Sequence, residues 1–458
     1  MGPRRKSARK SARSNGRRGE KHIQLASQPG CILKMPDEII GNIMELIVPF
    51  SCMDNPDITP SYTVVEEIIK YSRTACALSC VSRRFRYIAL HTPVLWSMVV
   101  KKQSFPYKLF VERSGRVPLR VACDIDNEDC QVSDIRDRLR ALKIYQPAFD
   151  RFHRSSGNYT DMNFPVLETL IVTGNERFPY GFLLRWQAPV LKHLTARCFI
   201  LPIFMASTLT TLSLDLYFNP QITQAINSRR GLFQHHLTTF LTQCKMLKTL
   251  HLKWRKGLPA DFGWRGATLP SLESLQISLS DTYQTSMGAF WKGIQMPNLR
   301  QLIITGLFDR TDPDASLEDL FDSLGPLASV RILDLNVTWH ARSREWGCMK
   351  PFDVPFKYIE QHMPNIADIK LDGVGAHSQQ LPDCQLPAFR TLRAKFARYI
   401  FMDDILKFVK SNIVNHEDGG KIDPFRLFAS VRPRESVNTV DYKEAVANGL
   451  LEYIDSNI

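Results

Sequence analysis

From residue 167 onward, apolar residues recur in the spacing Leu-x-x-Leu-x-Leu, with polar residues at most of the intervening positions. Alternation of this kind over a few residues is typical of a strand with one buried face. The template returns nine times at intervals of 18 to 38 residues, and such self-similarity predicts a stack of repeats. The expected strands contain Leu167-Leu170-Val172, Leu191-Leu194-Ala196, Leu209-Leu212-Leu214, Leu247-Leu250-Leu252, Leu272-Leu275-Ile277, Leu299-Leu302-Ile304, Val330-Leu333-Leu335, Ile366-Ile369-Leu371 and Phe389-Leu392-Ala394.

Between several of these strands the apolar spacing changes to three and four residues, which indicates helices. The helices precede the fourth, sixth, seventh and eighth strands, at 232–244, 283–294, 317–324 and 356–363. A helix before each strand predicts a parallel α/β arc in which the leucines face inward and the x positions point out of the concave face. Repeats need neighbours to bury their apolar faces, so we expect a cap, with helical candidates at Ile400–Asn412 and Val440–Ile454.

The N-terminal part of the chain has a different pattern, two amphipathic segments separated by the polar residues 51–63. In the first segment Pro36 stands where the first turn of a helix accepts proline. The second segment follows a helical turn expected over Val64–Tyr71 and is predicted as one helix that Pro93 ends. The apolar residues at helical spacing are Ile39, Ile40, Ile43, Met44 and Ile47 in the first segment, and Leu78, Val81, Phe85 and Ile88 in the second.

These two segments carry a family resemblance. The order Met-Pro-Asp-Glu-Ile-Ile, then Ala-Leu-Ser-Cys-Val-Ser-Arg-Arg-Phe-Arg-Tyr-Ile-Ala, then Thr-Pro-Val-Leu-Trp-Ser resembles the F-box in the form common in fungal proteins. Leu109–Leu119 is similar to the segment after the F-box in mushroom-type members. The family pattern usually starts Leu-Pro and has Trp at the place of Phe85, so Met35 and Phe85 are departures. The repeats resemble leucine-rich repeats, although the Asn that usually comes after the last Leu occurs only at Asn175.

The resemblance implies a substrate-recognition subunit of an SCF-type cullin–RING ubiquitin ligase. The F-box would dock on the ligase's adaptor protein, and through it on a cullin, while the repeats would bind a target protein. Core packing within the helical module is the alternative for each docking residue, and it weighs most for Val81 and Phe85. The residues expected to face or support the adaptor are Met35, Pro36, Ile39, Ile40, Ile43, Leu78, Val81 and Phe85.

Candidate target-binding residues come from the x positions of the repeats. They are mixed in charge and lean basic, which suits a protein-binding surface, and the cations would accept an acidic or phosphorylated segment. A solvated sheet face without a target is the alternative. The candidates are Lys192, Lys248, Glu273, Arg300, Arg331, Asp368 and Arg390.

The net charge of +13 is unevenly placed, because residues 1–21 hold nine cations against Glu20 alone. A stretch so rich in Arg, Lys, Ser and Gly cannot bury enough apolar surface to fold and is expected to be disordered. It predicts a nuclear-localisation signal or a nucleic-acid-contacting arm, or else a solvated tail. A nuclear leucine-rich scaffold that contacts nucleic acid is therefore the alternative function. The candidate signal comprises Arg4, Arg5, Lys6, Arg9, Lys10, Arg13, Arg17 and Arg18.

No motif in the chain predicts catalysis, and we expect no enzyme activity, no cofactor and no bound metal. The sequence has no Gly-x-Ser-x-Gly elbow and no Walker loop, and its ten cysteines form no Cys-x-x-Cys pair. Free thiols fit a reducing compartment. The basic, polar N-terminus has no apolar core of a signal peptide, and no apolar run approaches the ~20 residues that span a bilayer. We expect an intracellular protein of the nucleus, the cytoplasm or both.

The sequence thus predicts an α/β chain in five parts. A helical F-box module precedes an irregular leucine-rich-repeat solenoid, which ends in a helical cap. Between module and solenoid we expect a strand at Val117–Ile125 and a helix at Val132–Phe149. The expected divisions are a disordered basic tail at 1–30, the module at 31–100, a linker with the first solenoid elements at 101–160, the solenoid at 161–396 and the cap at 397–458.

Overall fold

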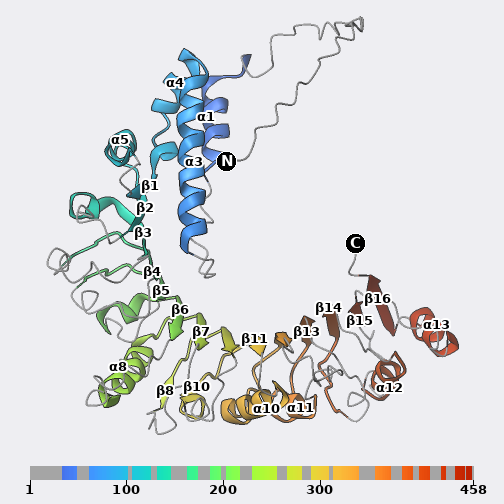
Figure 1. The fold of residues 1–458 in the computed structure, drawn as a ribbon. Coiled ribbons are helices and arrows are strands. Elements are labelled where there is room, and N and C mark those ends of the chain that lie inside the picture. Colours follow the sequence, from blue (N-terminus) through green and yellow to red (C-terminus); the bar gives the residue numbers. More distant parts are fainter. Residues whose placement is uncertain are drawn as a thin grey trace, which may run out of the picture.

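The protein is mixed α/β, built on one large open sheet that curves into an arc in the computed structural model (Figure 1). Strands line the inner side of the arc, most of the helices lie outside it, and a group of helices stands at its N-terminal end. The structure describes residues 34–48, 61–101, 106–124, 132–145, 162–173, 186–196, 203–216, 230–254, 266–280, 290–308, 313–339, 356–372, 384–395, 402–412, 424–429, 439–448 and 450–455.

The main sheet has fourteen strands, and each pairs in parallel with its neighbours on either side in the sheet. The strands come in chain order, apart from a separate pair formed by β8 (Ala267–Thr268) and β10 (Ile294–Gln295). The main strands are β1 (Met98–Lys101), β2 (Leu119–Asp124), β3 (Leu139–Tyr145), β4 (Thr169–Thr173), β5 (His193–Ala196), β6 (Thr211–Leu216), β7 (Thr249–Trp254), β9 (Ser274–Ser280), β11 (Gln301–Phe308), β12 (Ile332–Trp339), β13 (Asp368–Asp372), β14 (Thr391–Lys395), β15 (Phe425–Ala429) and β16 (Leu451–Asp455).

Helices connect many of these parallel strands. Gly325, at φ 66°, comes directly after the last residue of α10, and its N–H donates to the carbonyl of Phe321 (3.1 Å), as expected of a glycine that ends a helix. The helices are α1 (Asp37–Leu46), α3 (Ser61–Val81), α4 (Arg83–Leu90), α5 (Tyr107–Arg113), α8 (Arg230–Gln243), α10 (Pro313–Leu324), α11 (Phe356–His362), α12 (Met402–Asn412) and α13 (Thr439–Ala447), with 3-10 helices η2 (Pro93–Trp96), η3 (Ser133–Arg138) and η6 (Ile203–Thr208).

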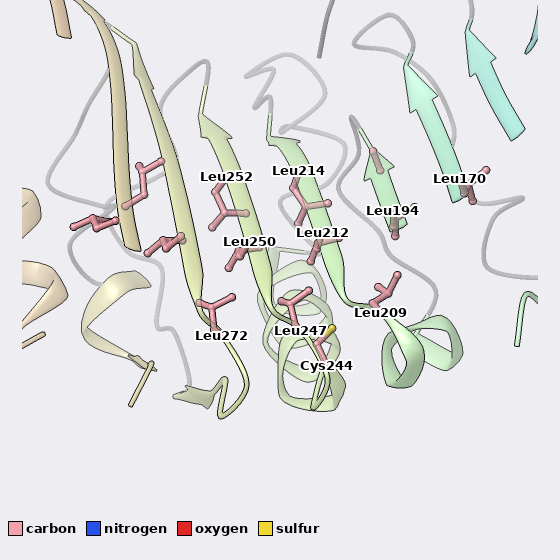
Figure 2. Close-up of a cluster of buried hydrophobic side chains, with 14 of the residues drawn as sticks. Leu170, Leu194, Leu209, Leu212, Leu214, Cys244, Leu247, Leu250, Leu252 and Leu272 are labelled. Carbon is pink, nitrogen blue, oxygen red and sulfur yellow. The ribbon is translucent and has the colours of Figure 1, made fainter. Parts of the chain in front are cut away.

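The nine predicted repeats all form strands, β4 to β7, β9 and β11 to β14. Their leucines lie in one layer between the sheet and the outer helices, as Figure 2 shows for β4 to β7 and α8. The apolar template residues from Leu167 to Leu392 are at most 1% exposed. The helices predicted before the fourth, seventh and eighth repeats are confirmed as α8, α10 and α11. Of the helix predicted over 283–294, residues 283–289 lie outside the described residues, and Ile294 belongs to β10.

The sheet extends past both ends of the range 161–396, with β1 to β3 before it and β15 and β16 after it. The strand expected at Val117–Ile125 is confirmed as β2. The helix expected at Val132–Phe149 is wrong, because the chain forms η3 and then β3. The helix at Ile400–Asn412 is confirmed as α12. The one expected over Val440–Ile454 is only half right, since α13 gives way to β16.

The N-terminal helical module (37–96) consists of α1, α3, α4 and η2. The second amphipathic segment is not the single helix that its spacing predicts but two helices that meet at Ser82. The Ser82 hydroxyl accepts a hydrogen bond from the Phe85 N–H (3.1 Å) and so caps α4. The turn predicted over Val64–Tyr71 belongs to the 21-residue helix α3. Arg84 on α4 forms an ion pair with Asp37 in the first turn of α1 (2.6 Å).

Buried aromatic residues join the module to the sheet. The Trp96 indole N–H donates to the carbonyl of Ala89 (2.7 Å), and the Tyr71 hydroxyl donates to the carbonyl of Leu95 (2.7 Å). The Arg113 guanidinium of α5 lies over the Trp96 ring at 4.5 Å. Strand β1 then begins only two residues after Trp96, and α3 and α5 both pack against it. The module is therefore attached to the sheet by packing as well as by the chain.

Candidate protein-binding surfaces

The helical module leaves apolar side chains in solvent on one face of α1. Ile39, Ile43 and Leu46 recur at steps of four and three residues, so they lie on the same side of the helix. They are 45%, 40% and 85% exposed, while Ile40 and Met44, which lie next to them around the helix, are buried. Helix α1 therefore has a broad apolar surface, and the chain itself covers only one side of it.

The eight residues predicted to contact or support a partner divide by burial. Ile39, Ile43 and Pro36 are exposed on or beside α1, and Val81 is 63% exposed at the end of α3. Met35 and Leu78 are half-buried against the core. Ile40 and Phe85 are buried, so they can support such a surface but cannot form it. Sequence reasoning missed three further exposed apolar residues of the module, which are Leu46, Tyr87 and Leu90.

The concave side of the sheet carries a second candidate surface at the starts of the strands. The first x residue of each repeat donates its N–H to the carbonyl of the corresponding residue on the preceding strand, at 2.8 to 2.9 Å. This hydrogen-bonded series, here called the strand-start row, runs through Arg140, Glu168, Lys192, Thr210, Lys248, Glu273, Arg300, Arg331, Ala367 and Arg390. Six of the seven predicted target-binding residues belong to it. The seventh, Asp368, lies one position further along β13.

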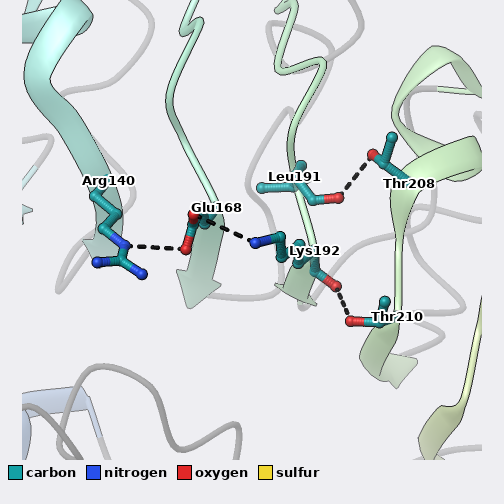
Figure 3. A network of polar contacts seen from close by, with 6 residues as sticks. All are labelled: Arg140, Glu168, Leu191, Lys192, Thr208 and Thr210. Carbon is teal, nitrogen blue, oxygen red and sulfur yellow. Dashed lines mark hydrogen bonds and ion pairs between the residues drawn. The ribbon is translucent and has the colours of Figure 1, made fainter.

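The first charges in the strand-start row neutralise one another (Figure 3). Glu168 receives the Arg140 Nε at 3.0 Å and the Lys192 Nζ at 3.4 Å, on two different oxygens. Partial burial would raise the pKa of Glu168, but the hydrogen bonds and charges of Arg140 and Lys192 outweigh it and lower the pKa below its usual value. Lys248 and Glu273 form a further ion pair (3.5 Å).

The concave face is closed to solvent over its first strands. The register pairs Lys143, Ile171, Thr195 and Ser213 across β3 to β6, and all four are at most 5% exposed. Thr169, an x position expected to point outward, is also buried. The residues in the same register on β7 to β12 are half-buried. Those on β13 and β14, Lys370 and Arg393, are exposed. Among the strands described, it is therefore the later ones that offer this face to a partner.

A chain of polar contacts crosses the middle of the concave face. The two ring nitrogens of His251 lie 3.3 Å from the Ser213 hydroxyl and 2.9 Å from the Ser278 hydroxyl. Ser278 in turn lies 2.7 Å from the Thr305 hydroxyl. These contacts join β6, β7, β9 and β11, so they hold the strands in register where the face begins to open.

Within the described residues, no group of three His, Cys, Asp or Glu side chains is placed to hold a metal ion. Burial raises the pKa of the Cys244 thiol to about 12, which keeps it protonated. No helix in the described part of the chain has both the length and the apolar character that crossing a bilayer requires. The cations of the candidate localisation signal, Arg4 to Arg18, lie outside the described residues.

No family model matches the chain, and no curated protein matches it.

Proposed function

We propose that the chain is the substrate-recognition subunit of an SCF-type cullin–RING ubiquitin ligase. In this proposal the F-box-like module docks on the adaptor, and the leucine-rich-repeat solenoid, which β15 and β16 continue, holds a target protein. The supporting observation is the exposed apolar face of α1, because Ile39 and Ile43 belong to the segment that resembles the F-box. Apolar side chains on one side of a helix suit a partner's hydrophobic groove.

The division of the docking residues by burial supports this proposal. Ile40 and Phe85 fill the core beneath the surface, while Ile39, Ile43 and Val81 remain available for contact. Exposing three apolar residues on one short helix has a cost in water that a bound partner would remove. The adaptor would then cover a face that the chain leaves uncovered.

The proposed mechanism is tethering. The chain would hold its target near a ubiquitin-conjugating enzyme that the ligase supplies, which raises the effective concentration of the two reactants without a bond made by the chain itself. Tethering requires that the two binding surfaces keep a fixed relation. The contacts of Trp96, Tyr71 and Arg113 at the start of the sheet provide that relation.

The test is capture of a recombinant adaptor by the purified chain. The variant Ile39→Asp/Ile43→Asp places two charges on the exposed face and should lower capture about tenfold or more, since each contact loses apolar burial and gains a buried charge. Val190→Asp/Met246→Asp is the matched control, because both residues are exposed apolar ones on the arc. Failure of the unaltered chain to capture the adaptor would rule the proposal out, as would equal loss in both variants.

A second candidate function, a nuclear scaffold with a nucleic-acid-contacting arm, is favoured by the concentration of charge in residues 1–21. Nucleic-acid binding by that stretch should weaken steeply with salt, because each phosphate contact releases a counterion. Deleting residues 1–21 should abolish it. Binding that survives the deletion would contradict this second candidate.

A further inference from the structure

The strand-start row changes its charge pattern towards its C-terminal end. Up to Glu273 its cations alternate with carboxylates that they contact, as the pairs around Glu168 and Glu273 show. Beyond Glu273 every charged residue of the row is an arginine: Arg300, Arg331 and Arg390. Over the last four repeats the row thus holds three cations and no anion.

None of the three arginines has a carboxylate of the described residues within ion-pair distance. The Arg331 guanidinium donates to the carbonyl of Asn365 (3.1 Å), and that of Arg390 donates to the carbonyls of Pro387 (2.6 Å) and Phe389 (3.0 Å). Other cations on the neighbouring strands do have carboxylate partners. Lys370 lies 2.8 Å from Asp334, and Arg426, whose N–H donates to the carbonyl of Arg390 (2.8 Å), lies 3.0 Å from Glu452. Among these cations, Arg300, Arg331 and Arg390 are therefore the ones without a carboxylate partner in the described residues.

The backbone hydrogen bonds fix the spacing of the backbone at the three arginines, from which the guanidinium groups extend. Arg300 and Arg331 start adjacent strands, and Arg390 starts the strand two further along. Neighbouring strands lie about 4.8 Å apart, so the row from Arg300 to Arg390 spans about 14 Å. An extended peptide rises about 3.4 Å per residue and points alternate side chains to the same side. Along the row, Arg331 and Arg390 lie about 5 and 14 Å from Arg300, while residues i+2 and i+4 of such a peptide lie about 7 and 14 Å from residue i. Residues i and i+4 would therefore face Arg300 and Arg390, and residue i+2 would lie about 2 Å past Arg331, within reach of its long side chain.

We propose that Arg300, Arg331 and Arg390 bind an extended acidic segment of a partner protein, with Asp or Glu at positions i, i+2 and i+4. A planar guanidinium binds a carboxylate through two parallel N–H donors, so each arginine takes one acidic side chain. Ile332, which is 38% exposed one position after Arg331, adds an apolar contact beside the charges.

Neighbouring carboxylates favour a peptide over a nucleic acid. Asp368 lies one position beyond the row on β13, between the strands that carry Arg331 and Arg390, and Glu273 precedes Arg300. The phosphates of a nucleic acid continue past the three arginines, so they would also come close to Glu273. A peptide with only three acidic residues brings no negative charge there.

This inference rests on the proposed function for its biological setting, because the segment would belong to the ligase target. The binding itself needs no adaptor. A chain that binds acidic peptides but captures no adaptor would contradict the proposed function alone, and the reverse result would contradict this inference alone.

The test is fluorescence anisotropy of the full chain with labelled nine-residue peptides. The first peptide has three glutamates separated by serines. Its companions carry glutamine at those positions, three contiguous glutamates, or phosphoserine in place of glutamate, and a single-stranded oligonucleotide is the last probe. The variant is Arg300→Gln/Arg331→Gln. The matched control is Lys192→Gln/Lys248→Gln, which removes the same charge from the same row at cations that already have carboxylate partners.

We expect the alternating-glutamate peptide to bind at least about tenfold more tightly than the glutamine peptide, the contiguous peptide and the oligonucleotide. The arginine variant should weaken it by about tenfold, and the lysine control by less than about twofold. Equal weakening in both variants would overturn the proposal, because it would show general attraction between charges. Binding of only the phosphoserine peptide, or equal binding of the contiguous peptide or the oligonucleotide, would overturn it as well.

Discussion

Arg84 Nε lies 2.7 Å from Asp37 Oδ1, although 47 residues separate the two along the chain. The same guanidinium donates to the backbone carbonyl of Met35, just before α1. Arg84 therefore holds both the first residue of α1 and the segment that leads into it. The exposed face with Ile39 and Ile43 begins within one turn of this anchor, so its orientation depends on a residue of α4.

Arg84→Leu should loosen α1 without unfolding the arc. Loss of a half-exposed ion pair and of one charged hydrogen bond should lower the local stability of α1 by about 1–2 kcal/mol. Hydrogen exchange of residues 37–46 should become faster. Arg83→Leu is the control, because Arg83 is exposed on the same helix. Equal exchange rates in α1 for both variants would show that the Arg84 contacts do not hold the helix.

Phe85→Ala and Val81→Ala should differ strongly in stability, although both residues were predicted for the same surface. Phe85 is 7% exposed, so its truncation leaves a cavity that costs about 3–5 kcal/mol. Val81 is 63% exposed, and its truncation should change stability by less than about 0.5 kcal/mol. Urea unfolding followed by tryptophan fluorescence measures both. A Val81→Ala variant as unstable as Phe85→Ala would contradict the described packing.

Tyr71→Phe should isolate the hydrogen bond between α3 and η2. The substitution keeps the ring and leaves the Leu95 carbonyl without its donor, which should cost about 1–2 kcal/mol. Burial also raises the pKa of Tyr71, so this side chain should not ionise in native absorbance titrations up to about pH 11. Tyr87→Phe, at an exposed residue, should leave the unfolding midpoint unchanged. A midpoint for Tyr71→Phe equal to that of the unaltered chain would count against this bond.

Glu168→Gln should lower stability at neutral pH but not in acid. The pKa of Glu168 is lower in the folded chain than its ordinary value of about 4.3, so its contribution is complete above that value and is lost as the pH falls through the folded pKa. Because Arg140 and Lys192 are about half exposed, the effect at pH 7 should stay below about 1 kcal/mol. Thermal midpoints at pH 7 and at about pH 3 measure it. A difference that persists in acid would exclude charge pairing as the cause.

The repeats could be predicted from sequence because every apolar template residue has the same environment. Each leucine faces the layer between strand and helix, so spacing alone identifies it. The Leu-x-x-Leu-x-Leu spacing also occurs in one more strand, which was not predicted. Leu139, Leu142 and Ile144 have the template spacing and form β3, but Val132, Ile135 and Leu139 also match a helical period. The strand forms because β2 and β4 pair with it on both sides, and this information is not local.

Burial on the surfaces was harder to predict than the elements themselves. A continuous helix would place Val81 on the same side as Phe85 and Ile88, but the break at Ser82 turns Val81 into solvent. The x positions Thr195 and Ser213 have the polar character of a solvated face and are nevertheless buried. Neither outcome can be derived from periodicity, because each depends on how distant elements pack. The residues that lie side by side across neighbouring strands likewise cannot be identified without the strand register.

Strand order has one further consequence for the two surfaces. Because the strands of the main sheet pair in chain order, the displacement between α1 and the three arginines is the sum of the strand-to-strand steps between them. Inserting or deleting one strand–helix unit between β6 and β7 would move one surface relative to the other by one strand spacing, about 4.8 Å, and a fixed rotation. The separation of the two surfaces therefore changes in steps of one strand, without any change to the residues of either surface.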